Sequence, residues 1–201
     1  MFTFLDNYNI KRSNNDIEYH PLKPFIDQDT EILFLGSFPP QRKKWAIDFF
    51  YPNFINDHWR IQGIVFHQDK DFFVDTENKT FKLDAIVNHC KKYHIGYYDT
   101  ATAVKRLKDN ASDKFLEILI PTDIKRLIQQ APKIKAIATT GTKATETICQ
   151  QLDISDIPKV GQSIIITSLN NIQLFRLPSS SRAYPLSLEK KALAYKPFLT
   201  Q

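Results

Sequence analysis

The sequence is poor in cysteine and has no long apolar run, and both absences exclude classes of protein. Among its 201 residues there are only two cysteines, Cys90 and Cys149, whereas an iron–sulfur cluster is held by four thiolates. Because the two lie far apart in helix-like segments, we expect both to be reduced, partly buried thiols. No apolar run approaches the ~20 residues that a membrane-spanning helix needs. The first residues lack the basic and apolar regions of a signal peptide, so we expect a cytoplasmic protein.

Recognisable metal and nucleophile motifs are also missing. None of the five histidines has a ligand-like spacing to a second histidine, a carboxylate or a cysteine, so no metal is predicted. The sequence supports no Ser-His-Asp constellation. The segment Gly141-Thr142-Lys143 is not a phosphate loop, because the preceding glycine is absent at the required offset.

Positive charge is concentrated in the second half of the chain. Residues 1–100 carry 12 Lys and Arg against 14 Asp and Glu, whereas residues 101–201 carry 15 against 8, a net charge of +7. A basic half can face a polyanion, and an ordinary solvated surface is the alternative. The hydrophobic content of 42% is sufficient for a core. We expect one domain over residues 1–201, with an irregular N-terminal segment over residues 1–30.

One stretch, residues 31–40, organises the rest of the chain. Residues 32–35 are four consecutive apolar residues, typical of a central strand that is covered on both faces of a parallel sheet. Gly36 then permits a sharp turn or a close approach, and the prolines that follow cannot continue the strand. Because ligands of open parallel sheets bind beyond the carboxyl ends of the strands, we expect residues 36–40 to form the floor of a site. A plain strand-exit turn is the alternative.

Strand-like and helix-like segments alternate along the remaining sequence. This alternation predicts a three-layer α/β/α sandwich with a largely parallel sheet. The expected strands are residues 32–35, 95–99, 134–139, 163–169 and 172–177, the last two joined by an Asn170-Asn171 turn. The expected helices are residues 53–66, 81–93, 121–131, 142–152 and 188–195, the third opened by Pro121. We expect residues 69–79 to form a loop or hairpin and residues 100–120 to form a polar connection.

Three loops follow strands in this arrangement, and in such a fold they converge on one edge of the sheet. They are residues 36–40, residues 139–143 and the serine loop, residues 178–182. This convergence is a stronger indication of a site than any single loop.

Three short motifs, in this order and spacing, resemble the uracil-DNA glycosylase superfamily. The resemblance covers residues 21–198 and is nearest to the hypoxanthine-DNA glycosylase-like and mismatch-specific uracil/thymine glycosylase branches. The motifs are Gly36-Ser37-Phe38-Pro39, Phe49-Phe50-Tyr51-Pro52 with Asn56 and Trp59, and Leu177-Pro178-Ser179-Ser180-Ser181-Arg182. The resemblance implies a central, mostly parallel four-stranded sheet and hydrolysis of the N-glycosidic bond of a deaminated base in DNA. It implies no cofactor, no metal cluster, no membrane association and a monomer.

The resemblance assigns roles to residues of the three loops. The amides of Ser37 and Phe38 would stabilise the anionic leaving base, as in an oxyanion hole. Asn56 matches an asparagine that the hypoxanthine branch uses in catalysis or base recognition, so we assign catalysis to Asn56 and Ser37. A helix N-cap is the alternative role of Asn56. The expected base-binding pocket is formed by Gly36, Phe38, Pro39, Phe50, Tyr51 and Thr140.

The serine loop suits a phosphate backbone, because small residues allow close approach and offer N–H and hydroxyl groups. We expect DNA contacts from Ser179, Ser180, Ser181, Arg182 and Lys143. The alternative is an ordinary loop before a helix, with Ser187 as the cap. For the aromatic residues 49–51, core packing is the alternative to base stacking.

The sequence departs from the family pattern in two places. The first loop has no Asp or Asn to orient a water molecule, and Thr140 stands where the hypoxanthine branch often has an amide. A DNA glycosylase is therefore the first hypothesis. A catalytically silent nucleic-acid-binding relative is the second, and an α/β protein that binds a small nucleotide anion is the third.

Overall fold

The computed structural model of this chain describes residues 17–107 and 115–200. Its large sheet has the strand order β5-β2-β8-β10-β9. The first four strands are parallel to one another, as predicted, and β9 is a fifth strand that runs antiparallel to β10 at the edge. The sheet is therefore mixed, with five strands instead of four. The bounds are β2 Ile32–Gly36, β5 Ile95–Asp99, β8 Ala136–Thr139, β9 Ser163–Ile166 and β10 Ile172–Arg176.

The strand β2 lies at the centre of the core, as its unbroken apolar run predicts. Its first four side chains are at most 4% exposed. Both neighbouring strands pair with it in parallel, so helices must cover both of its faces.

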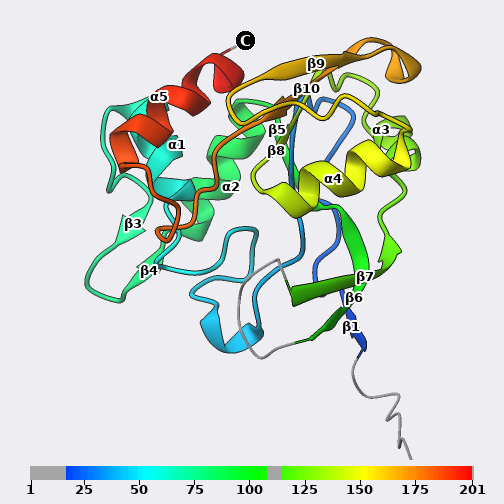
Figure 1. Cartoon of the computed structure of the whole chain (residues 1–201). Helices are drawn as coiled ribbons and strands as arrows, with labels where there is room; N and C mark the ends of the chain where they lie inside the picture. The colour runs from blue at the N-terminus through cyan, green and yellow to red at the C-terminus, as the bar shows by residue number, and fades with distance from the viewer. Residues whose placement is uncertain (1–16, 108–114, 201) are drawn as a thin grey trace, which may run out of the picture.

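Helices cover both faces of the sheet, and the predicted three-layer sandwich is confirmed. Figure 1 shows α1, α2 and α5 on one side of the sheet and α3 and α4 on the other. Their bounds are α1 His58–His67, α2 Leu83–Lys92, α3 Ile124–Gln130, α4 Thr142–Gln151 and α5 Leu188–Leu199. The Ser187 hydroxyl caps α5 by accepting a hydrogen bond from the Lys190 amide. Within the described ranges, no helix is both long and apolar enough to cross a membrane.

Two predicted connections contain strands, and the predicted start of α3 is wrong. A second sheet of order β1-β6-β7 consists of β1 Ile17–Tyr19, β6 Ala101–Arg106 and β7 Leu116–Pro121. Pro121 therefore ends a strand, and α3 begins at Ile124 behind Asp123, whose carboxylate accepts from the Arg126 amide. Residues 17–30 are thus not wholly irregular, and residues 100–120 are not a plain polar connection. The rest of these two segments, residues 1–16 and 108–114, lies outside the described residues.

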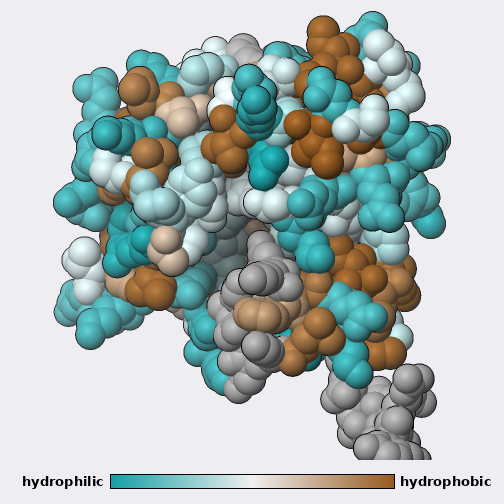
Figure 2. All heavy atoms as spheres, in the orientation of Figure 1, coloured by the Kyte–Doolittle hydropathy of each residue, from teal (hydrophilic) through white to brown (hydrophobic). Residues whose placement is uncertain are grey.

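One face of this small sheet is buried and the other is largely exposed. Ala101, Val104 and Leu116 pack inward against Phe38, whereas Ile17, Leu119 and Ile120 are between 39% and 50% exposed. Figure 2 shows apolar surface over the region where Figure 1 places β6 and β7. Because β6 follows β5 after a single residue, the small sheet lies at the carboxyl edge of the large one.

The remaining elements are short. The predicted hairpin within residues 69–79 is β3 Val74–Asp75 paired with β4 Thr80–Phe81. Asn170 and Asn171 both have positive φ, as predicted for a turn, but the strand predicted over residues 163–169 ends at Ile166, and a short 3₁₀ helix precedes the two asparagines. Two 3₁₀ helices, η2 Arg42–Lys44 and η4 Thr167–Leu169, complete the described chain.

Candidate active site

The three predicted loops leave neighbouring strands at one edge of the large sheet. Leu35 of β2 pairs with Thr139 of β8, which in turn pairs with Arg176 of β10. The pairing continues past β10, because the Leu177 amide donates to the Thr139 carbonyl oxygen at 2.9 Å. The loops that begin at Gly36, Thr140 and Pro178 therefore start side by side, and the predicted convergence is confirmed.

The segment that carries Asn56 is joined to the serine loop through the backbone. Asn56 forms an antiparallel bridge with Ser181, and the Asp57 amide donates to the Ser180 carbonyl oxygen at 2.9 Å. Residues separated by more than 120 positions thus form one surface at this edge.

Buried charges fix this junction. Asp57, which is 6% exposed, accepts from Arg182 Nε at 3.1 Å and from Lys191 Nζ at 2.9 Å. Lys191, on α5, is 1% exposed and also donates to the Ser181 carbonyl oxygen at 2.8 Å. Because buried ions are tolerated only when they are paired and hydrogen-bonded, this cluster holds the serine loop against the start of α1.

Asn56 is not the N-cap of α1, because that position is held by Asp57. Asn56 Oδ1 accepts from the His58 amide at 2.9 Å, at the first residue of α1, and this bond orients the side-chain amide. No partner for Asn56 Nδ2 is found among the described residues. The residue is half-buried beside the serine loop.

Tyr51 lies across the second of the three loops. Its hydroxyl and Thr140 Oγ1 are 2.8 Å apart. Its ring is stacked on the buried His58 imidazole, with centroids 3.7 Å apart and planes 7° apart. Burial lowers the pKa of His58 well below its usual value, so Tyr51 rests on a neutral ring. Tyr51 also adopts a φ of 49°, and a non-glycine residue there is a local strain typical of functional sites.

The first loop is more deeply buried than its predicted role suggests. Ser37, Phe38 and Pro39 are all buried. The Phe38 ring packs against the small sheet, and the Pro39 carbonyl oxygen accepts from Arg106 Nη2 at 2.6 Å. Arg106 is in turn paired with Glu18 of β1 through Nε. The small sheet therefore holds this loop in place.

Phe50 lies in the core and is 4% exposed. Its ring stacks on Tyr97 and meets Phe49 and Tyr98 edge-on. Core packing, the alternative considered for the aromatic residues 49–51, describes both Phe49 and Phe50. Of the three, Tyr51 is the one at the edge.

The serine loop uses part of its hydrogen-bonding capacity internally. Ser179 Oγ accepts from the Ser181 amide at 3.2 Å, and Ser181 Oγ accepts from the Ala183 amide at 3.3 Å. Ser180 is 2% exposed. Arg182 is about half exposed despite its bond to Asp57, and the half-buried Lys143 lies in the first turn of α4.

One pair at this edge was missed from the sequence. His20 Nε2 lies 2.8 Å from Asp99 Oδ2, with side-chain exposures of 2% and 10%. His20 comes from the segment after β1, and Asp99 is the last residue of β5, beside Gly36. An acidic residue at the end of a buried strand was the available signal.

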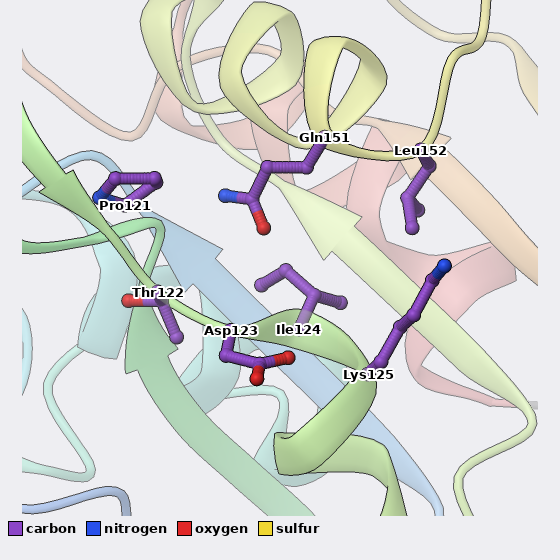
Figure 3. A pocket seen from close by; sticks show the side chains of 7 residues that line it. All are labelled: Pro121, Thr122, Asp123, Ile124, Lys125, Gln151 and Leu152. Atoms are coloured by element: carbon purple, nitrogen blue, oxygen red, sulfur yellow. The ribbon is translucent and has the colours of Figure 1, made fainter.

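Two cavities lie away from these residues. The first, of about 290 Å³, is lined by residues from the start of α3 and the end of α4 (Figure 3). The second, of about 440 Å³, lies beside η2. Neither is lined by a predicted site residue. Within the described residues, no group of three histidine, cysteine or acidic side chains is arranged to hold a metal ion.

Comparison with known proteins identifies the family. No protein-family model matches the chain. It is 32% identical over 126 residues to a protein of Methanosarcina barkeri named hypoxanthine DNA glycosylase, a match that covers 61% of this chain and 71% of that one. The chain belongs to the hypoxanthine-DNA glycosylase branch of the uracil-DNA glycosylase superfamily. A solution NMR structure from Methanosarcina acetivorans, named as a candidate uracil DNA glycosylase, shares the fold with a TM-score of 0.59 and 23% identity. That match covers 90% of this chain and 98% of that one.

The structure shows what surrounds the two positions at which this chain departs from the superfamily's sequence pattern. Thr140 stands where an amide is often found, and here its hydroxyl is engaged with Tyr51. The first loop lacks a carboxylate, yet Asp99 of the neighbouring strand lies beside it. The edge therefore holds a carboxylate even though residues 36–40 do not.

Proposed function

We propose that this protein is a DNA glycosylase that hydrolyses the N-glycosidic bond of a deaminated base flipped out of DNA. The observation that carries the proposal is the junction of Asn56 with the serine loop at the edge where Gly36 and Thr140 also lie. A flipped nucleotide needs a base pocket next to a phosphate-binding surface, and at this junction the two would adjoin.

The serine loop and its neighbours would hold the DNA backbone. Arg182 and Lys143 are accessible cations near small residues whose backbone a phosphate can approach. Phosphate contacts carry no sequence information but offset the few kcal/mol needed to unstack a base. Arg182 is paired with the Asp57 carboxylate, which offsets part of its positive charge. It would therefore contribute mainly as a well-positioned hydrogen-bond donor to the phosphate.

The base would lie between Tyr51 and the first loop. Stacking of a base on an aromatic ring is worth about 1–3 kcal/mol, and Tyr51 is oriented for it by His58 and Thr140. The backbone amides of Ser37 and Phe38 would donate to the base oxygen. Asn56 Nδ2, held by the bond of its Oδ1 to the His58 amide, would donate to the base or to the attacking water.

The reaction would be simple hydrolysis by a single-domain monomer. A glycosylase that also cleaves the strand attacks the sugar with an amine. Lys191 is the buried lysine at this edge, and its side-chain nitrogen is already engaged by two acceptors, the Asp57 carboxylate and the Ser181 carbonyl oxygen. Water is therefore the proposed nucleophile, and no cofactor is needed.

A base-release assay tests this function. Duplex and single-stranded oligonucleotides containing uracil, hypoxanthine or thymine opposite guanine would be incubated with the full chain, and abasic sites measured. Asn56→Asp keeps the oxygen that holds the start of α1 but replaces the Nδ2 donor, so we expect at least ~100-fold slower release. Asn56→Ala is the companion variant, with DNA affinity measured for both.

The outcomes separate the hypotheses. Release of any of these bases, lost in both Asn56 variants with the fold retained, supports the proposal. DNA binding without release of a base indicates a silent relative of the same fold. Absence of DNA binding at low salt indicates a binder of small anions and contradicts the proposal.

A further inference from the structure

A buried histidine–carboxylate pair at the active edge has no role in the function described so far. His20 Nε2 and Asp99 Oδ2 are 2.8 Å apart, and the His20 side chain is almost completely enclosed. Its other nitrogen, Nδ1, is held by the Leu22 backbone, 2.8 Å from the carbonyl oxygen and 3.1 Å from the amide nitrogen. The ring also contacts Phe38 and Tyr98. The imidazole therefore cannot turn without breaking contacts on all sides.

The second oxygen of Asp99 faces the first loop. A Cβ atom built on Gly36 would overlap Asp99 Oδ1, so this oxygen lies directly over the Gly36 backbone. Among the described residues no donor to Oδ1 is found, whereas Oδ2 is bound by His20. The side chain is buried but not fully enclosed, with 10% of its surface exposed. Asp99 therefore presents one oxygen at the turn where the sequence lacks a carboxylate.

We propose that Asp99 is the carboxylate that orients and deprotonates the attacking water, and that His20 is its positioning residue. This inference rests on the glycosylase function proposed above. In the step, the water oxygen forms a bond to the sugar C1′ while the C1′–N bond breaks and its electron pair leaves on the base. The water proton passes to Asp99 Oδ1, and the anionic base later takes a proton from solvent.

The charge distribution of the transition state favours a role of Asp99 in water activation over a role in recognising the base. The transition state carries positive charge on the sugar and negative charge on the leaving base. A carboxylate beside the sugar stabilises the first, whereas a carboxylate against the base would oppose the second. The neutral donors of the Gly36 loop suit the base, and Asp99 suits the water and the sugar. The loop after β2 would thus bind the leaving base, and the last residue of β5 would activate the water.

The decisive variant is Asp99→Asn, which keeps the shape and removes the base. We expect single-turnover release to slow by about 100-fold or more, by a similar factor for every base that the wild-type protein releases, with DNA affinity within about threefold. Asp29→Asn is the matched control, because it removes one carboxylate from an exposed pair with Lys133, before the amino end of β2. We expect the control to keep the wild-type rate.

The role of His20 is tested by rescue. His20→Gln can still donate a hydrogen bond to Asp99 from a similar position, whereas His20→Phe fills the space without a donor. We expect the glutamine variant to retain a larger part of the single-turnover rate than the phenylalanine variant, at equal urea midpoints. Equal rates in the two variants would mean that His20 has only a packing role, which contradicts the proposal.

Failure of this inference is distinguishable from failure of the proposed function. If the wild-type chain releases no base, the glycosylase function itself is wrong. If wild type is active and Asp99→Asn keeps its rate, Asp99 is not the water-activating group. If the slowing differs strongly from base to base, Asp99 reads the base instead, and the assignment to water is overturned.

Discussion

Lys191 and Asp57 form a buried ion pair across 134 positions of sequence, with Nζ and Oδ2 2.9 Å apart. The same ammonium group binds the Ser181 carbonyl oxygen. The bond connects α5, the start of α1 and the serine loop, so the geometry of the proposed DNA surface depends on a residue that solvent hardly reaches.

We predict that Lys191→Met destabilises the protein by about 3–5 kcal/mol, because it leaves Asp57 buried with only the partly exposed Arg182 as partner. Lys190→Met is the matched control on the same helix, since Lys190 is exposed, and we expect a change below ~0.5 kcal/mol. Urea unfolding measures both. Equal stabilities of the two variants would show that the pair does not hold this junction.

A second prediction concerns Gly36, where a side chain would collide with Asp99. Gly36→Ala must displace either the carboxylate or the turn, and we expect a loss of about 1–3 kcal/mol in the free energy of unfolding. In the double variant with Asp99→Ala the obstacle is gone. We therefore expect its loss in the free energy of unfolding to be smaller than the sum of the losses of the two single variants. Strict additivity in this cycle would contradict the close approach.

A third prediction concerns two histidines of a buried polar network around Gln62 and Tyr97. Burial lowers the pKa of His58 well below its usual value and lowers that of His89 to about 3. The unfolded chain binds protons at these histidines near pH 6.5, whereas the folded chain does not, so stability falls as the pH drops below that value. Each histidine should contribute a slope of about 1.4 kcal/mol per pH unit between roughly pH 6 and 5.

Urea unfolding at several pH values measures this slope. His89→Gln removes one titrating group, and we expect it to lower the slope by the contribution of one histidine. His94→Gln is the control, because His94 lies outside the network in the turn before β5. An unchanged slope in His89→Gln would mean that His89 is protonated in the folded protein.

The large sheet was predictable because its signals are local. Residues 32–35 form a continuous apolar run, and Asn170-Asn171 lies between two apolar-rich segments, residues 163–169 and 172–177. The helices were predicted to within a few residues, except that α1 starts at His58, five residues after the predicted start, and α3 starts three residues after Pro121. In both cases the backbone before the helix makes contacts with distant segments, which a local pattern does not contain.

The small sheet and the buried pairs could not be predicted in the same way. The strand β6 has small and charged residues and is stabilised by β1 and β7, which come from distant parts of the sequence. His20 and Asp99 are separated by 79 positions, and neither stands in a motif. The family pattern located Asn56 and the serine loop at one edge, but it did not reveal that Asp57 and Lys191 join them.

The position of His20 has a practical consequence for protein engineering. It precedes every strand of the large sheet, so a recombinant form trimmed to begin at Pro21 would retain all of that scaffold and lose one half of a buried pair. Circular dichroism of such a fragment would report helices and strands much like those of the full chain. If Asp99 activates the water as proposed, such a fragment would lose turnover without a change in its spectrum, so fragments of this protein are best compared by turnover.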